Sequence, residues 1–374
     1  MIVSDGRRPA TALQSGGKPL KAREKPGAVT FSRTVPRQLV HREALGEVFL
    51  TDMVGLGERE FLCGAQLPRQ HAYFSDTICE PSMFDAVLLM ESVRQAAFVG
   101  AHRQFSVPDG HKFILPGISL SVSRPDALRR GSLPAEMSIF AAVTKVKTTE
   151  GLCTGLDYEM QLSIGGDIVA SAQTGMRMRT PGAYRRMRDD HRAGRDLKAD
   201  QTATPLPVLP ARVGRAAGKN VVLGDVEVSQ DGASATLLVP LDHPSMFDHP
   251  QDHIPGMVLV EAGRQLALLA ASECCGLSPA KTYLVQWTAK FTQFGEIEVP
   301  ALARAVVSQP VIDQQGRANA QVGLTFSQDL GPICLATAVV QTHPILPPVG
   351  SGLAGSDLAE QRGDTVPVSH AVRG

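Results

Sequence analysis

The sequence of 374 residues has no excess of charge of either sign. It contains 37 Lys and Arg against 37 Asp and Glu, so its formal net charge is zero. Proteins that bind nucleic acid through bulk attraction to phosphates are strongly basic, and no helix-turn-helix segment is evident. We therefore expect no nucleic-acid partner.

Long apolar runs are also missing. The longest, around residues 257–271, is interrupted by Glu261, Arg264 and Gln265, so it is too short and too polar to span a membrane. The N-terminus has no apolar core of the signal-peptide kind. We expect no membrane partner and a cytoplasmic location.

The sequence lacks the short patterns of common cofactor and nucleophile sites. Its six Cys form no CxxC pair, which favours reduced, structural thiols. No GxGxxG, GxxxxGK[ST] or GxSxG is present, so neither a nucleotide cofactor nor a serine nucleophile is indicated. His249 and His253 are four residues apart, but Pro250 and Pro255 disfavour the regular helix that a zinc-binding HExxH pair needs. We expect no cofactor and no metal.

Polar segments divide the chain into two parts of similar length. Residues 1–35 and 347–374 lack apolar periodicity and are expected to be disordered tails. Residues 181–214 are charged and then proline-rich, which is typical of a linker. The ordered parts are then 36–180 and 215–346, each of domain size.

The two parts repeat one pattern. Each has two short β-like runs, a loop with His, Phe and Asp, one helix-like segment that is apolar on nearly all faces, and several longer β-like runs. The loop sequence "HAYFSD" from residue 71 parallels "HPSMFD" from residue 243, and "VLLMESVRQA" from residue 87 parallels "MVLVEAGRQL" from residue 257. These parallels predict an internal duplication.

One buried helix and an antiparallel sheet in each part predict an α+β double hotdog, in which each sheet wraps around its helix and the two sheets join edge to edge. The expected helices are 83–104 and 255–275. The expected strands are 47–56, 59–68, 111–123, 134–148, 151–164 and 167–178, then 220–229, 234–241, 280–294, 299–308, 317–327 and 331–341.

Each expected helix carries the same polar triplet at positions i, i+3 and i+4, which share one face: Glu91, Arg94 and Gln95 in the first, and Glu261, Arg264 and Gln265 in the second. In a structural interpretation, the Glu and Arg neutralise each other in the core. A buried ion pair rarely adds net stability, however, and its presence in both halves favours a functional site.

The loop before the second helix is rich in polar side chains: His243, Asp248, His249, Asp252 and His253. Pro255 and Gly256 follow, and Pro255 is expected in the first helical turn. Free amides at the start of that helix suit an oxyanion, a carbonyl or a phosphate. The first half lacks the paired Asp-His and the Pro-Gly, so we expect two clefts that are not equivalent.

Four stretches resemble the A-factor biosynthesis (AfsA-type) family: "VHREALGEVFLTD" from residue 40, "FDAVLLMESVRQAAFVGAH" from residue 84, "HPSMFDHPQDHIPGMVLVEAGRQLAL" from residue 243, and "WTAKFTQFGEIEVPA" from residue 287. A weaker similarity extends to hotdog β-hydroxyacyl dehydratases. The family resemblance implies an acyltransferase. It would move a β-ketoacyl group from an acyl carrier protein to dihydroxyacetone phosphate, and the ester would close to a butenolide or furan precursor of a signalling molecule.

The resemblance also implies roles for the polar residues. Glu91 or Glu261, with a raised pKa, would be the base. The phosphate would be bound by Arg264, Arg94 and Lys290. The thioester oxygen would be stabilised by Gln265, Gln95 or the amides near Gly256. Proton relay or phosphate binding would fall to His243, His249 and His253, with Asp252 as a further substrate contact. Glu91 and Arg264 are the favoured pair. A hotdog dehydratase or thioesterase, and a non-catalytic ligand-binding regulator, remain as alternatives.

Overall fold

A computed structural model describes residues 28–195, 197 and 205–344 of the 374. The expected tails lie outside these residues, except for 28–35, where Val35 is buried and donates a backbone hydrogen bond to Leu50. Among the described helices, none is both long and apolar enough to cross a membrane.

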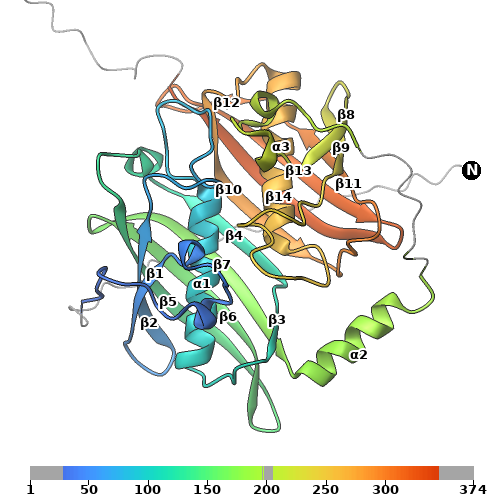
Figure 1. Cartoon of the computed structure of the whole chain (residues 1–374). Coiled ribbons are helices and arrows are strands. Elements are labelled where there is room, and N and C mark those ends of the chain that lie inside the picture. The colour runs from blue at the N-terminus through green and yellow to red at the C-terminus, as the bar shows by residue number, and fades with distance from the viewer. Residues whose placement is uncertain (1–27, 196, 198–204, 345–374) are drawn as a thin grey trace, which may run out of the picture.

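The two halves share two strands, a central helix and four further strands in the same order, and each adds one short strand at a different place, Lys112–Ile114 in the first half and Val311–Ile312 in the second (Figure 1). The first half consists of β1 Leu50–Gly55, β2 Glu60–Leu67, α1 Ala86–Arg103, β3 Lys112–Ile114, β4 Gly117–Val122, β5 Ala135–Thr149, β6 Leu152–Ile164 and β7 Asp167–Arg179. The second half consists of β8 Leu223–Val228, β9 Gly232–Leu237, α3 Gly256–Cys275, β10 Thr282–Phe291, β11 Leu302–Val307, β12 Val311–Ile312, β13 Ala318–Gln328 and β14 Gly331–Thr342. Both expected helices are confirmed, and so are the expected strands, except that 111–123 is divided into β3 and β4 and that the short β12 was not expected.

All strands belong to one antiparallel sheet of order β1-β2-β5-β6-β7-β4-β10-β14-β13-β11-β9-β8, with β3 on β7 and β12 on β13. The halves meet where β4 pairs with β10, from Gly117 opposite Lys290 to Ser121 opposite Gln286. Figure 1 shows α1 and α3 on the same side of this continuous sheet, each crossing the strands of its own half. The double hotdog with edge-to-edge sheets is confirmed.

Small residues let both central helices lie close to the sheet. A Cβ atom at Gly100 of α1 would come within 2.5 Å of the Phe61 ring, and one at Gly263 of α3 within 2.4 Å of the Trp287 ring. Close packing buries almost every side chain of both helices, polar ones included. The triplets therefore lie in the core.

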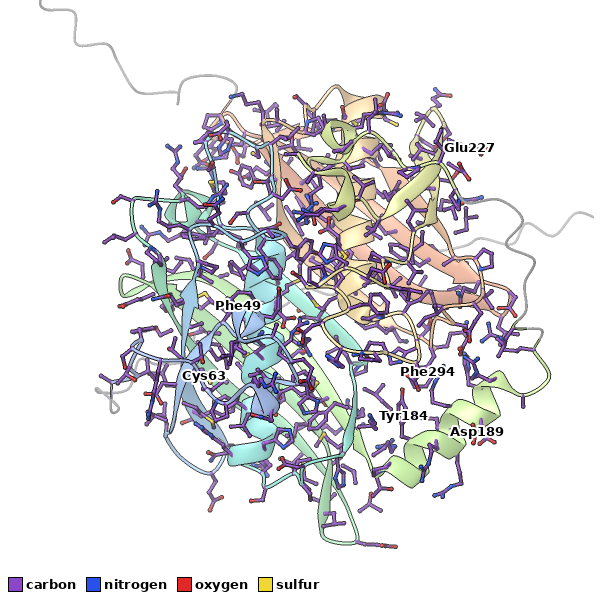
Figure 2. All side chains as sticks on the ribbon, viewed as in Figure 1. Phe49, Cys63, Tyr184, Asp189, Glu227 and Phe294 are labelled. Carbon is purple, nitrogen blue, oxygen red and sulfur yellow. The ribbon has the colours of Figure 1, made fainter. Side chains whose placement is uncertain are left out.

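The segment expected as a linker contains a helix, α2 Pro181–Arg192, which starts at the N-cap Thr180. It packs against the loop that follows β10. Tyr184 and Phe294 meet edge to face between α2 and that loop, whereas Asp189 lies on the outer face of α2 (Figure 2). Arg188 anchors the helix by donating to both oxygens of the buried Glu296.

Candidate functional site

The first triplet forms one cluster around Glu91. Arg94 donates to both carboxylate oxygens at 2.8 Å, and Gln95 donates to Oε1 at 2.7 Å. A second arginine, Arg42, also reaches Oε1, with Nη2 at 2.7 Å. Two guanidinium groups thus enclose one buried carboxylate.

The second triplet forms the corresponding cluster around Glu261. Arg264 donates from Nε at 3.0 Å and from Nη2 at 2.7 Å, and Gln265 donates to Oε1. Arg215 is the second arginine, with Nη2 2.8 Å from Oε2 and no exposed surface on either side chain. Tyr73 of the first half adds a hydroxyl at 3.1 Å. The repeat thus preserves a Glu between two Arg.

Sequence reasoning missed Arg42 and Arg215, although the repeat holds a signal for them. The glutamine of each cluster accepts from a backbone N–H of an entering strand segment, at Phe49 in the first half and Val222 in the second. Each missed arginine stands seven residues before that amide. Alignment of the two halves on these segments would have placed the two arginines together.

The expected raised pKa of the glutamates is wrong. Burial alone would raise the pKa of Glu91, but Arg42, Arg94 and the hydrogen bonds lower it to about 2. The pKa of Glu261 is lowered to about 2 in the same way, with Arg215 and Arg264 outweighing burial. The second arginine is the physical reason, because two nearby cations favour the ionised carboxylate.

Within each cluster, one carboxylate bonds to two guanidinium groups, so the Glu–Arg pair of the structural interpretation is present together with a second arginine. Further carboxylates act on these arginines from nearby, Glu47 and Asp248 on Arg42 and Asp85 on Arg264. Burial would lower the pKa of Arg264, yet Glu261, and to a lesser degree Asp85, raise it above its usual range. A buried fixed cation of this kind can stabilise an anionic group or an oxygen that gains negative charge during a reaction.

Each cluster contacts a loop of the other half: Arg42 donates to the Ser245 carbonyl, and the Tyr73 hydroxyl donates to Glu261. The loop after β2 reaches the second half, where Asp76 accepts from the backbone of Ala217 and from Asn220. The loop after β9 reaches the first half, where Asp248 accepts from the backbone of Ala44, and where Ser245 is bonded to Glu47. Both clusters therefore lie at the junction between the repeats.

His243 supports its own loop. Its Nδ1 accepts from the backbone of Ser245 at 3.1 Å and Met246 at 3.2 Å, and its Nε2 lies 2.7 Å from Oδ1 of Asn220. Burial lowers its pKa. Both ring nitrogens have partners within the protein.

His249 lies beside the first cluster. Burial lowers its pKa, Asp248 opposes this, and Arg42 and Arg94 lower it further. Within the first cluster, the guanidinium of Arg94 lies over the Phe98 ring, 4.7 Å from its centroid. The Arg94 side chain is 14% exposed, against 4% for Arg264. The first cluster is thus the more open one.

Three other expected site residues lie away from the clusters. Asp252 and His253 bond to each other at 2.7 Å, and Asp252 also binds Tyr184 and Arg188 of α2. Lys290 is exposed on β10, whereas its neighbour Ala289 faces the core. By strand alternation, Lys290 points away from the helices. It is therefore not a phosphate ligand beside Arg264.

Gly256 is the first residue of α3, and Pro255 is its N-cap rather than a first-turn residue. No side chain caps this helix start. Among the described residues, no group of three or more His, Cys, Asp or Glu is placed to hold a metal ion.

A cavity of about 40 Å³ lies beside the second cluster. Arg264 and Asp85 supply its charged wall, and the rest is mostly apolar, with side chains from both halves. The favoured pair of the sequence is not brought together by hydrogen bonds, because Glu91 belongs to the first cluster and Arg264 to the second.

Comparison with known proteins finds one family that matches both halves of the chain. The model of the A-factor biosynthesis hotdog domain matches residues 24–180 and 197–345. A 2-oxo-3-(phosphooxy)propyl 3-oxoalkanoate synthase of Streptomyces virginiae is 32% identical over 300 residues, which cover 80% of this chain and 95% of that protein. A synthase of the same name from Streptomyces griseus is 32% identical over 292 residues, covering 78% and 90%.

Solved structures that resemble the chain are more distant. An oleoyl thioesterase from Lactobacillus plantarum is 12% identical with a TM-score of 0.44, covering 76% of this chain and 97% of that one. A MaoC-like dehydratase is 13% identical with a TM-score of 0.40, covering 70% and 84%. The family match over both halves, with relatives of 32% identity, shows that this chain belongs to the AfsA family of A-factor biosynthesis hotdog proteins.

Proposed function

We propose that this protein is an acyltransferase that joins a β-ketoacyl thioester to dihydroxyacetone phosphate and forms a 2-oxo-3-(phosphooxy)propyl 3-oxoalkanoate, the product in the name of its relatives. The observation that carries the proposal is the paired arginine cluster in each half, which fixes two guanidinium groups around one buried carboxylate. Such a site suits a phosphorylated substrate and a negatively charged transition state.

The reaction makes one bond and breaks one. The hydroxyl oxygen of dihydroxyacetone phosphate attacks the thioester carbonyl carbon, the C–S bond breaks, and the hydroxyl proton leaves with the thiolate. Negative charge builds on the carbonyl oxygen before the C–S bond breaks. A guanidinium already fixed by Glu91 or Glu261 requires no reorganisation to stabilise that charge.

This proposal gives the residues of the triplets new roles. Glu91 and Glu261, with pKa values of about 2, hold their arginines in place and do not remove protons. Arg264 faces the thioester oxygen in the cavity, and Arg94, on the more open side, receives the phosphate. Gln95 and Gln265 connect each cluster to the backbone of its own half.

We further propose that the acyl donor is a carrier-protein thioester, that the protein acts in the cytoplasm without nucleic acid or membrane as a partner, and that the ester closes to a butenolide or furan precursor of a signalling molecule. The resemblance to a family whose members make such precursors supports this.

Mass spectrometry of the products tests the function. The protein is given a β-ketoacyl carrier-protein thioester, or its pantetheine mimic, with and without dihydroxyacetone phosphate. We expect a phosphorylated ester, or its cyclised product, only with the phosphate, and its loss in Glu91→Gln and Arg264→Ala. Hydrolysis or dehydration without the phosphate would instead identify a thioesterase or dehydratase, and binding without turnover a regulator.

A further inference from the structure

The two helix starts differ in a way that separates the two clusters. α1 starts at the N-cap Asp85, whose Oδ1 accepts from the Val87 amide at 2.9 Å. α3 starts at Pro255, which has no side-chain oxygen and makes no cap. The repeat thus places a carboxylate at one helix start and none at the other.

The second oxygen of Asp85 is free. Its Oδ2 is buried and makes no hydrogen bond within the described part of the chain, and the residue is 8% exposed. A capping role uses only Oδ1. A buried carboxylate oxygen without a donor is costly, and such exceptions in native structures have a cause.

Asp85 shares a cavity with the cluster arginine of the other half. Both line the space of about 40 Å³ beside the second cluster. Arg264 uses Nε and Nη2 to bind Glu261, which leaves Nη1 for a ligand. Leu128, Leu268 and Leu284 contribute apolar surface to the same space. The cavity thus combines the Asp85 carboxylate, the Arg264 guanidinium and an apolar wall.

We propose that Asp85 is the general base of the acyl transfer and that the reaction takes place in this cavity, at the second cluster. The inference rests on the proposed function. Asp85 Oδ2 takes the proton from the primary hydroxyl of dihydroxyacetone phosphate while the hydroxyl oxygen bonds to the thioester carbon. Arg264 faces the resulting oxyanion. The C–S bond then breaks, and the thiolate takes the proton back from Asp85.

This assignment leaves one reaction centre in each chain. The first cluster has Arg94 in the place of Arg264, but Pro255 stands where the base would be. The cavity of about 40 Å³ is much smaller than ordinary ligand pockets of roughly 300–1,000 Å³, so it must open before the two substrates can enter, with the apolar wall facing the acyl chain.

Asp85→Asn separates catalysis from structure, because Asn is as good an N-cap as Asp but cannot accept the proton. We expect kcat to fall by about 100-fold or more, the lower range for loss of a general base. KM for the thioester should stay within about threefold and the melting temperature within a few degrees. Asp109→Asn is the matched control, because its side chain is 95% exposed, and it should behave as wild type.

Three outcomes would overturn the assignment: full kcat in Asp85→Asn, a loss confined to KM, or a loss that follows the melting temperature. If Asp85→Asn does not fold, Asp85→Ser, which keeps the cap with a different side chain, decides by the same criteria. The proposed function fails separately, if the wild-type protein forms no phosphorylated ester in this assay.

Discussion

Replacing Arg215 by Met tests whether the second arginine holds the Glu261 cluster together. The change keeps an unbranched apolar side chain and removes the guanidinium. It also removes donors to the carbonyl oxygens of Tyr73 at 2.7 Å and Asp76 at 2.9 Å. Breaking a buried ion pair costs about 3–5 kcal/mol. At about 2–4 °C for each kcal/mol, the melting temperature should fall by about 6–20 °C.

The assay is calorimetry and urea unfolding of the full chain, with Arg212→Met as the matched control. Arg212 lies three residues earlier and pairs with Glu273 on the surface, with side chains 42% and 35% exposed. Such a pair contributes about 0–1 kcal/mol. If Arg215→Met loses no more stability than Arg212→Met, the buried cluster is not held by its charges, and the reasoning on both clusters fails.

Three further predictions follow from the packing and the charges. Since folding lowers the pKa values of Glu91 and Glu261 from 4.5 to about 2, the stability they provide is present above pH 4.5 and lost as the pH falls toward 2; circular dichroism should show acid unfolding there, and a flat profile would contradict it. Gly263→Ala should lower the free energy of unfolding by about 1–3 kcal/mol, because the added methyl group overpacks against Trp287. Trp287 is the one Trp of the chain, so its fluorescence spectrum should change, and an unchanged spectrum would argue against that contact. Leu128→Ala should enlarge the cavity and shift the preferred acyl chain to greater length, which competition between thioesters measures by mass spectrometry; an unchanged preference would place the acyl chain elsewhere.

The fold could be predicted from the sequence because its signals are local and occur twice. The expected helices 83–104 and 255–275 match α1 and α3 within three residues. Helix α2 was missed because its segment is too polar to show an apolar stripe. The helix is held to the protein by the pairing of Arg188 with Glu296, which lies 108 residues away in the sequence, so no local pattern reveals it.

The site was only partly predictable. Sequence spacing identified the triplets, because the Glu, Arg and Gln are one helical turn apart. Spacing within a helix could not identify Arg42, which is 49 residues from Glu91, or Arg215, which is 46 residues from Glu261; only alignment of the segments that enter the two halves could have paired them. Without the second arginine, a buried glutamate is expected to have a raised pKa. With the second arginine present, the pKa of each glutamate is lowered to about 2 instead.

The continuous pairing of β4 with β10 has an evolutionary consequence. In a dimer of identical hotdogs, every substitution occurs twice, and dilution separates the halves. Here a single peptide chain keeps the partners together at any concentration, so each copy can mutate without its twin. The chain contains the result, with Asp85 in one copy and Pro255 in the other, and with Glu47 and Asn220 as the two residues whose carbonyls bind the cluster glutamines. Fusion has turned a symmetric assembly into one whose two halves are free to specialise.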